Sequence, residues 1–591
     1  GEGTSSAEFQ SEGLVVASVE TLKEAAYFPY VSTAAWNSST KTITTSLPAT
    51  YEYAANTNNN AVMAALMAED AQSSISFQNA GALYAITVEN ILAGYNKAVM
   101  TYLDAEDNVG IAGAATITFV DGVPTLAVPD AADAASAQKT ITITFTGTDD
   151  KTFYFPMPVK ASGYANKLQF SLQGEGKDAI TAPVFTKEPV RSNLYAVTLK
   201  LDAVSGGIVS EANDIEAANA ALANDAVTSV AVKDATDEDA AITIPAKSTE
   251  SAAVEHTIDL SEAELPTTGP VEIVVTEGTG EKATVEKLTV IVPEGAEAGS
   301  YTINAPGTTV TIQGADGTVI ETIEATTAEN TLIIGEGVTI KNLTIKKGNV
   351  ELYGKLEKFT SEVATTIKLM KDIDLTSEWE IKQGMEVTLD LNGKILAVNN
   401  ATNHGIDNEG TLTINGNDGK ITWVATDHAD NAVYCIVNRA GATMNIDACE
   451  VAGPVYNVGN MTVENESKLT TNAANRAALI CGEDTNDIAW KFTMTGGSIV
   501  SETHSAAVLK NNYYGLNPQG LAKFDGVTFT GTNYYDIVLC AVNVEVSNCT
   551  FTSDNIWLKA NNYVSYVNGE ETKKEDLHPC KWSEIFPATN E

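Results

Sequence analysis

Two tyrosine pairs in similar surroundings are the residues best suited to contact a ligand. They occur in Asn511–Gly515 (NNYYG) and Thr532–Asp536 (TNYYD), 21 residues apart, and a shorter echo follows at Asn561–Tyr563. An aromatic ring packs on the apolar face of a sugar while an amide bonds hydroxyl groups, and both also suit a protein partner. The alternative is that the rings pack between neighbouring turns of the chain. The predicted ligand-binding residues are Tyr513, Tyr514, Tyr534 and Tyr535.

The sequence offers no complete set of catalytic residues. Glycoside hydrolysis needs two carboxylates that face one cleft, and the adjacent pair Asp149–Asp150 falls in a predicted hairpin turn. His404–Gly405 is preceded by Asn403 and not by the glycine of a pectinase-type phrase, and Arg439 and Arg476 are expected to lie about two coils apart. We therefore predict no catalytic residues, and a polysaccharide lyase or glycoside hydrolase remains the alternative.

Neither a metal nor a cofactor is predicted. The five histidines are scattered and none has the spacing of a metal-binding pair: His256, His404, His428, His504 and His578. The acidic run Asp234–Asp239 lacks the spacing of a calcium-binding loop and is expected to be a solvated turn.

The six cysteines all follow residue 434, and no two of them form a CxxC motif. Without that spacing a zinc ribbon is disfavoured, and small buried core residues are expected. Cys540 and Cys549 are the best candidates for a disulfide, because nine residues could fold back within one structural layer.

The charge of the chain limits its partners. The 591 residues carry a net charge of −42, with 77 acidic residues against 35 lysines and arginines. Such a surface repels phosphate backbones and anionic lipid, so nucleic-acid binding and polybasic membrane docking are excluded. No apolar run approaches the length of about 20 residues that spans a bilayer.

Alternation of apolar and polar residues recurs along the whole chain and predicts an all-β fold. In residues 1–205, turn signals separate the strands by 8–15 residues, which is typical of β-sandwiches. We divide this block into a subdomain at residues 1–74 and a second sandwich domain at 75–205. A short helix is expected at Ala61–Ala68.

This N-terminal block resembles the fimbrillin family of surface adhesins and pilus subunits of Bacteroidales-like bacteria. Seven phrases occur in the order that the family shows, among them YFPY, SLPATY and ISFQNAGALYAI: Tyr27–Tyr30, Ser46–Tyr51, Ala61–Ala65, Ile75–Ile86, Ile111–Gly113, Phe153–Pro158 and Arg191–Leu199. The resemblance implies a cell-surface protein on the extracellular face of an outer membrane. It also implies homologous pilus-type subunits as partners, and a lipid anchor that this chain does not carry.

The rest of the chain is predicted to be a parallel β-helix. From residue 387 a short alternating strand, a small or polar turn and another short strand recur about every 17–32 residues, first in VTLDLNGKI. Right-handed winding is expected. We predict a short module at 208–358, capped by a helix at Glu211–Ala223, and a main β-helix at 359–591. The TLDLNGK phrase resembles the right-handed β-helix domains of bacterial surface proteins.

Together these features predict a non-enzymatic adhesion or binding protein of a Gram-negative bacterium, with a surface glycan or protein as ligand. A structural stalk is the third possibility. The sandwich would anchor or assemble the protein, and the β-helix would bind.

The all-β prediction has a simple spectroscopic test. Circular dichroism should show a spectrum dominated by β-structure, because nearly every patterned segment has period two. A spectrum with substantial helix would contradict it.

Overall fold

The computed structural model describes residues 25–28, 34–54, 61–66, 77–133, 135–159, 164–201, 207–249, 255–295, 297–400, 402–423, 433–483, 488–511, 520–559, 566–571 and 577–581. Within these residues the fold is nearly all β, with one α-helix. Contacts divide the chain into two compact units. The N-terminal unit ends near residue 210, and the C-terminal unit holds most of the remainder.

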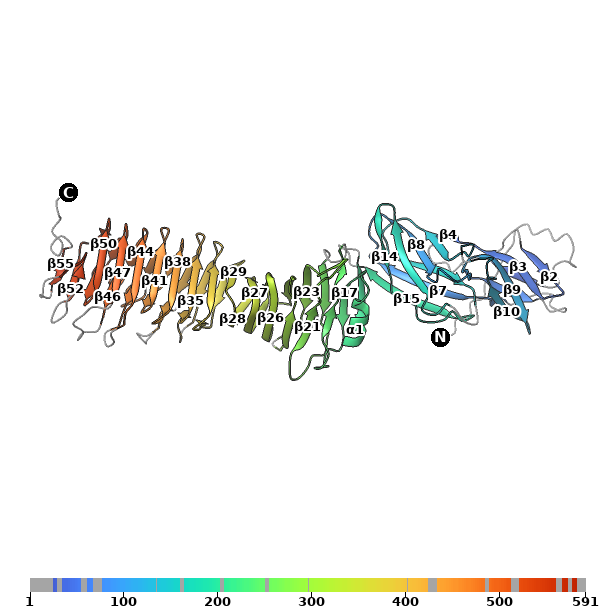
Figure 1. Ribbon diagram of the computed structural model, residues 1–591, viewed down its shortest axis with the longest axis horizontal. Coiled ribbons are helices and arrows are strands. Elements are labelled where there is room, and N and C mark those ends of the chain that lie inside the picture. Colours follow the sequence, from blue (N-terminus) through green and yellow to red (C-terminus); the bar gives the residue numbers. More distant parts are fainter. Residues whose placement is uncertain are drawn as a thin grey trace. The chain divides into compact units, whose positions relative to one another are not determined.

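The N-terminal unit consists of short, mostly antiparallel sheets (Figure 1). Their strands, given in spatial order for each sheet, are β1 (Ala25–Phe28), β5 (Met63–Leu66) and β6 (Gln78–Asn79); β10 (Val123–Ala127), β9 (Gly113–Val120), β3 (Thr42–Leu47) and β2 (Ala35–Asn37); β14 (Lys177–Thr181), β13 (Leu168–Gly174), β8 (Tyr95–Tyr102), β11 (Thr140–Thr144) and β4 (Thr50–Glu52); and β12 (Lys151–Met157), β7 (Ala82–Glu89), β15 (Leu194–Leu201) and β16 (Ile208–Ala212).

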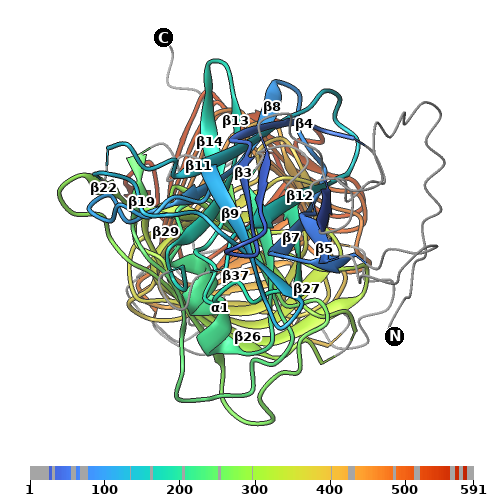
Figure 2. The ribbon, with the colours of Figure 1, turned by 90° about the vertical axis from the view of Figure 1, so that its right-hand side faces the viewer.

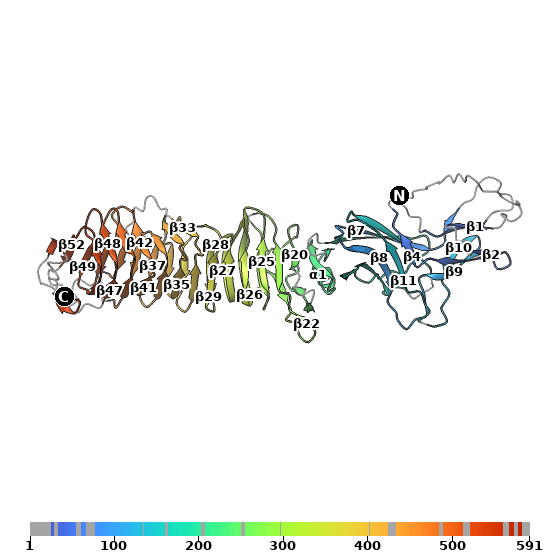
Figure 3. The same cartoon turned by 90° about the horizontal axis from the view of Figure 1, so that it is seen from above.

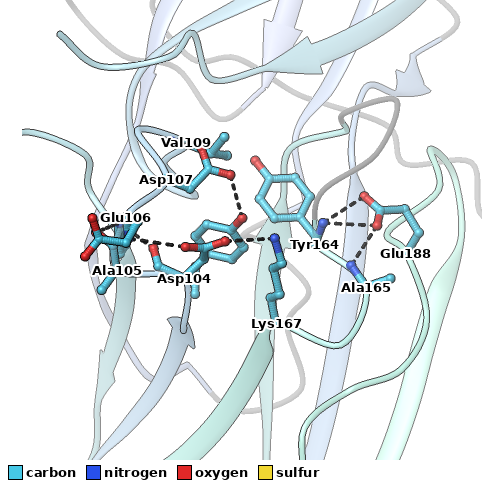
Figure 4. A network of polar contacts seen from close by, with 11 residues as sticks. Asp104, Ala105, Glu106, Asp107, Val109, Tyr164, Ala165, Lys167 and Glu188 are labelled. Atoms are coloured by element: carbon cyan, nitrogen blue, oxygen red, sulfur yellow. Dashed lines mark hydrogen bonds and ion pairs between the residues drawn. The ribbon is translucent and has the colours of Figure 1, made fainter. Parts of the chain in front are cut away.

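A polar network fixes the loop that follows β8 (Figure 4). Lys167 pairs with Asp104 at 2.8 Å, and the Tyr102 hydroxyl donates to Asp107 at 2.9 Å. Glu188 accepts two backbone N–H groups of the neighbouring loop. Burial, followed by the bond to Asp107, raises the pKa of Tyr102 to about 12. The groups of this network therefore bond one another, and nothing in it points to a ligand.

The C-terminal unit begins with strands that pair in parallel (Figures 1 and 3). They are β17 (Val227–Val232), β18 (Ile242–Ile244), β20 (Glu255–Asp259), β21 (Val271–Val275), β23 (Lys287–Ile291), β24 (Ser300–Asn304), β25 (Thr309–Gln313), β26 (Thr318–Ile334), β27 (Val338–Leu352) and β28 (Lys355–Ser361); the antiparallel pair β19 (Lys247–Ser248) and β22 (Lys282–Ala283) lies beside them.

From residue 365 each coil contributes one strand to each of three parallel ladders. The first ladder contains β29 (Thr365–Leu369), β32 (Glu386–Asp390), β35 (Thr411–Asn415), β38 (Thr443–Asp447), β41 (Asn460–Glu464), β44 (Lys491–Thr495), β47 (Leu521–Asp525), β50 (Asn543–Ser547) and β53 (Tyr566–Val567). The second contains β30 (Ile373–Leu375), β33 (Ile395–Val398), β36 (Lys420–Trp423), β39 (Glu450–Ala452), β42 (Lys468–Thr471), β45 (Ser498–Ser501), β48 (Thr528–Gly531) and β51 (Thr550–Phe551).

The third ladder contains β31 (Trp379–Ile381), β34 (Ile406–Asn408), β37 (Ile436–Asn438), β40 (Val455–Asn457), β43 (Leu479–Cys481), β46 (Ala507–Lys510), β49 (Ile537–Cys540) and β52 (Ile556–Lys559). Seen along the stack, the strands of successive coils lie behind one another (Figure 2).

The alternating sequence pattern explains the interior of the coils. In β32 the side chains of Val387 and Leu389 are buried, and each lies on its register partner in β35, Leu412 or Ile414. From β32 onward the same inward positions are filled by apolar residues along the first ladder, so each coil buries its apolar side chains against the next.

A row of buried asparagines runs inside the third ladder. The Asn408 amide donates to the Asn438 carbonyl oxygen at 2.8 Å, and Asn438 donates likewise to Asn457 at 2.8 Å. Each amide also donates to a backbone oxygen of the neighbouring first-ladder strand. All three side chains are fully buried, so their polar atoms depend on these bonds.

Both ends of the coil stack carry elements that differ from the parallel strands. Helix α1 (Ile215–Leu222) packs on β18, and the Asn219 side chain bonds the backbone beside that strand. At the C-terminal end β55 (Leu577–Cys580) pairs antiparallel with β52, and β54 (Glu570–Glu571) with β53. These antiparallel strands occupy edges that could otherwise pair with another chain.

Two local predictions need correction. The segment predicted as a helix at Ala61–Ala68 contains strand β5, because Ala64 packs into a core with Ile43 and Ile117 of another sheet. The capping helix is shorter than Glu211–Ala223, because residues up to Ala212 belong to β16 and the Asp214 side chain accepts from the Ala217 N–H to start the helix.

The cysteines follow the prediction of small core residues, and the proposed bridge is absent. Cys540 and Cys549 form no disulfide; the first is buried and the second is half-buried. Burial raises the pKa of the Cys549 thiol, which disfavours its reactive thiolate form.

Hydrogen bonding crosses two of the predicted domain limits. Strand β3 pairs with β9 across residue 74, and β27 pairs with β29 across residue 358. Paired strands therefore lie on both sides of residue 74 and of residue 358. The division into four domains stays a prediction.

Replacing Asn438 with alanine should destabilise the coil stack. The change removes bonds to Asn408, Asn457 and a backbone carbonyl and leaves buried polar atoms without partners. At about 1–3 kcal/mol for each unsatisfied buried group, we expect a loss of roughly 2–4 kcal/mol in urea unfolding. Thr413→Ala, on the outer face of β35, is the control and should cost well under about 1 kcal/mol. Equal losses for both variants would contradict the role of the asparagine row.

Candidate functional site

The turns that connect the second ladder to the third carry several aromatic, histidine and arginine side chains. We call them the edge turns; examples are residues 399–405, 472–478, 502–506 and 532–536. Side chains in these turns do not simply alternate between the interior and the solvent, because the backbone changes direction there. The turn conformation, as well as the ladder, therefore decides which way each side chain of an edge turn points.

Buried polar side chains hold the edge turns in shape. Asp536 is fully buried, and its carboxylate accepts the backbone N–H groups of Gly531, Ser553 and Asp554 at 2.9–3.0 Å. Ser501 accepts from the His504 N–H at 3.0 Å and donates to a carbonyl of the preceding coil. Each turn is thus tied to its neighbour, and the side chains that it carries are fixed relative to the ladder.

Tyr534 and Tyr535 lie in one such edge turn. Tyr534 is 45% exposed and stacks on His504 of the preceding coil, with ring centroids 4.6 Å apart. Tyr535 is half-buried and lies 5.4 Å from the Trp557 ring of the next coil. One ring of this predicted pair is therefore open to solvent.

The other predicted pair, Tyr513 and Tyr514, lies outside the described residues, as does Asn561–Tyr563. The flanking strands place Tyr513 in the sequence between β46 of the third ladder and β47 of the first, whereas Tyr534 lies between the second ladder and the third. Ala507 pairs with Ile537, so this coil is 30 residues long, whereas the two tyrosine pairs are 21 residues apart in the sequence. The four-tyrosine site as a whole stays a prediction.

Next to these turns, the outer face of the third ladder is apolar over five consecutive coils. Register pairs link five outward residues in a line, which we call the apolar lane: Tyr456, Ile480, Val508, Val538 and Trp557. Val538 is 7% exposed and the other four are half-buried. Each end of the lane is aromatic.

A second aromatic group lies at the Tyr456 end of the lane. Tyr434 stacks on Tyr456 with centroids 4.8 Å apart, and His404 stacks on Tyr434 at 5.9 Å. The Arg476 guanidinium lies 5.0 Å from the Tyr434 ring centroid and is 5% exposed. A cation placed over an aromatic face is attracted by the ring quadrupole, so the arginine strengthens this stack.

Two carboxylates adjoin this stack. Arg439 binds Asp407 in a two-pronged arrangement, with its Nε and one terminal nitrogen 2.8 and 2.6 Å from the two oxygens. Glu378 accepts the backbone N–H of His404. Burial, followed by the nearby charge of Asp407, raises the pKa of Glu378, whereas burial lowers the pKa of His404.

Glu378, His404 and Asp407 each place a potential metal-binding atom within 4.8 Å of the others. Their existing bonds oppose metal binding. The Tyr434 N–H donates to His404 Nδ1 at 3.1 Å, so the neutral imidazole carries its proton on Nε2 and offers no second lone pair. Both oxygens of Asp407 accept from Arg439. His404 and Asp407 therefore already use their potential metal-binding lone pairs in hydrogen bonds within the protein.

A small hollow of about 190 Å³ lies beside Glu378. Its walls come from β27, β28 and β31, and include Asn342, Thr360 and Lys382. The hollow is smaller than the roughly 300–1,000 Å³ of most ligand pockets, so it has room for a single small group.

The sequence did not reveal that these residues meet. Asp407 and Arg439 are 32 residues apart, and His404 and Tyr434 are 30 apart. They belong to a coil of 30 residues, whereas the coils before and after it have 27 and 19. A useful signal was the scarcity of arginine: the chain has three, and two of them, Arg439 and Arg476, lie at this stack. His428 lies outside the described residues.

Comparison with solved structures gives a weak likeness over part of the chain. A crystal structure of a putative cell adhesion protein from Bacteroides uniformis matches with a TM-score of 0.21 and 17% identity, over 31% of this chain and 68% of that one. A TM-score this low supports no argument about fold or function. No protein-family model matches the chain, and no curated protein matches it. Among the described residues, no helix has the length and apolar character needed to cross a membrane.

Replacing Glu378 with glutamine should stabilise the protein at neutral pH. A raised pKa in the folded state means that folding takes up a proton between the ordinary carboxyl value, about 4.3, and the raised one. Ionised Glu378 therefore costs stability, and this cost is absent below the ordinary value and grows as pH rises through the raised pKa. Melting temperatures of Glu378→Gln and wild type should coincide near pH 4 and favour the variant at pH 7.

An exposed glutamate supplies the control. Glu386→Gln, at the start of β32, should leave the melting temperature close to that of wild type. A Glu378→Gln variant that is less stable than wild type at pH 7 would contradict the assignment.

Proposed function

We propose that this chain is a non-enzymatic adhesion or binding protein of a bacterial cell surface. In this proposal the N-terminal unit is a fimbrillin-like β-sandwich that anchors or assembles the protein. The C-terminal unit is a right-handed parallel β-helix that presents the ligand-binding edge. The ordered fimbrillin-like phrases and the parallel ladders with short turns support this assignment.

The observation that carries the proposal is the exposed ring of Tyr534. A solvent-exposed tyrosine normally has a mobile ring, but here His504 stacks beneath it and Asp536 fixes its turn. Asn555 further donates to the Tyr534 carbonyl at 2.7 Å. A pre-positioned ring loses little conformational entropy on binding, which is what a binding surface needs.

A glycan is the ligand that this edge suits best. The aromatic rings offer flat apolar faces, and the nearby asparagines and hydroxyls offer hydrogen bonds. Burial lowers the pKa of His504, which keeps the imidazole neutral, and the net charge of −42 disfavours polyanions. The favoured ligand is therefore an uncharged sugar chain on another cell or on the host.

Glu378 and Asp407 favour a second candidate, a glycoside hydrolase. Hydrolases combine a carboxyl group of raised pKa with an ionised carboxylate nearby, and these two residues meet that description. Against it, both oxygens of Asp407 are bound by Arg439, so this carboxylate is poorly placed to attack a sugar or activate water. A structural stalk without a ligand is the third candidate.

Replacing Tyr534 with alanine should weaken glycan binding without unfolding the protein. An aromatic contact is worth about 0.5–1.5 kcal/mol, so the dissociation constant should rise roughly two- to tenfold. Binding is measured on an array of neutral and acidic glycans, and stability by the melting temperature. Tyr353→Ala, between β27 and β28, is the control and should bind as wild type does.

The same array separates the three candidates. Binding without release of reducing ends or unsaturated uronate supports the adhesion proposal. Turnover that Glu378→Gln abolishes would replace it with the hydrolase. If no glycan binds, the glycan proposal fails, and a protein ligand or a structural stalk without a ligand replaces it.

A further inference from the structure

We propose that the apolar lane binds a linear, neutral polysaccharide that lies along the axis of the coil stack, with about one sugar residue per coil. The inference rests on the proposed glycan-binding function and adds the form of the ligand and its direction. It concerns the third-ladder face from Tyr456 to Trp557 and not the single ring of Tyr534.

The spacing of the lane matches a polymer with a short repeat. Its five residues are register partners in consecutive coils. Neighbouring strands in a sheet are about 4.8 Å apart, so the four steps from Tyr456 to Trp557 span roughly 19 Å. That step is close to the length of one pyranose residue in an extended chain, so a linear polysaccharide can meet equivalent groups on successive coils.

The two ends of the lane have the chemistry of sugar platforms. Tyr456 belongs to the stack with Tyr434 and His404, and Trp557 lies against Tyr535. Between them Ile480, Val508 and Val538 form an aliphatic floor. C–H groups of a pyranose ring pack on both kinds of surface, and neither kind requires a charge on the ligand.

Three polar atoms in the edge turns beside the lane have no hydrogen-bond partner in the described part of the chain: His504 Nδ1, Ser505 Oγ and Asn555 Oδ1. All three are buried beneath the surface, so a sugar on the lane does not reach them. The contacts that the lane itself offers are those of its aromatic and aliphatic side chains.

The same face suits a peptide poorly. An extended peptide binds a sheet by adding a strand to an open edge, and its affinity comes from main-chain hydrogen bonds. The lane is the face of a ladder whose strands already pair with both neighbours, so it offers no such bonds. A sugar chain can instead pack its rings on the side chains of the lane, which needs no open strand edge.

The test is the dependence of affinity on ligand length. Immobilised neutral polysaccharides (β-glucan, xylan, mannan and amylose) identify the binder, and oligomers of two to eight residues of that polymer are then titrated. We expect affinity to rise steeply with length up to about five residues, the number of coils in the lane, and then to level off. Short and long oligomers that bind equally would overturn the lane while leaving glycan binding intact.

Two valines in one coil give a matched pair of variants. Val508 lies in the lane, whereas Val500 is half-buried on the outer face of the second ladder. Val508→Asp should weaken binding of the longest oligomer by about tenfold or more, and Val500→Asp by less than about twofold. Equal effects of the two variants would overturn the proposal, and so would tighter binding of a peptide or an acidic polysaccharide. If none of the four polysaccharides binds, both the lane and the glycan proposal fail.

Discussion

Register between parallel strands is the constraint on which the C-terminal unit depends. Each inward side chain must lie on its equivalent in the next coil, as Val387 lies on Leu412 and Leu412 on Met444. A shift of one residue would turn every buried side chain outward, so the strands tolerate no insertions. Length can vary only in the turns, and the aromatic, histidine and arginine side chains described above gather beside them.

The same constraint explains the polar residues inside the coils. Asn408, Asn438 and Asn457 form a fully buried row, and each satisfies the next coil as well as a strand of the first ladder. Asp536 and Ser501 do similar work at the edge turns. The buried hydrogen bonds therefore hold the backbone that carries Tyr456, Tyr534 and Trp557, and these side chains need no bonds of their own to keep their positions.

Sequence patterns revealed the parts of the fold that repeat with period two. The strand pattern of VTLDLNG matches β32 and its successors, and the helix at Glu211–Ala223 was nearly located. The sequence did not show which residues of successive coils lie on one another, because the coils differ in length. Asn408 and Asn438 are 30 residues apart, whereas Asn438 and Asn457 are 19 apart. For this reason the meeting of Asp407 with Arg439 was missed, and the grouping of the tyrosine pairs on one edge stays a prediction.

The central claim is that the outer face of the third ladder holds a neutral sugar chain. A crystal structure of the protein with a bound neutral hexasaccharide tests it most directly. The account predicts sugar rings packed in a line on Tyr456, Val508 and Trp557, parallel to the coil axis. Sugar rings seated on the first ladder or on the N-terminal unit, with this face empty, would contradict it.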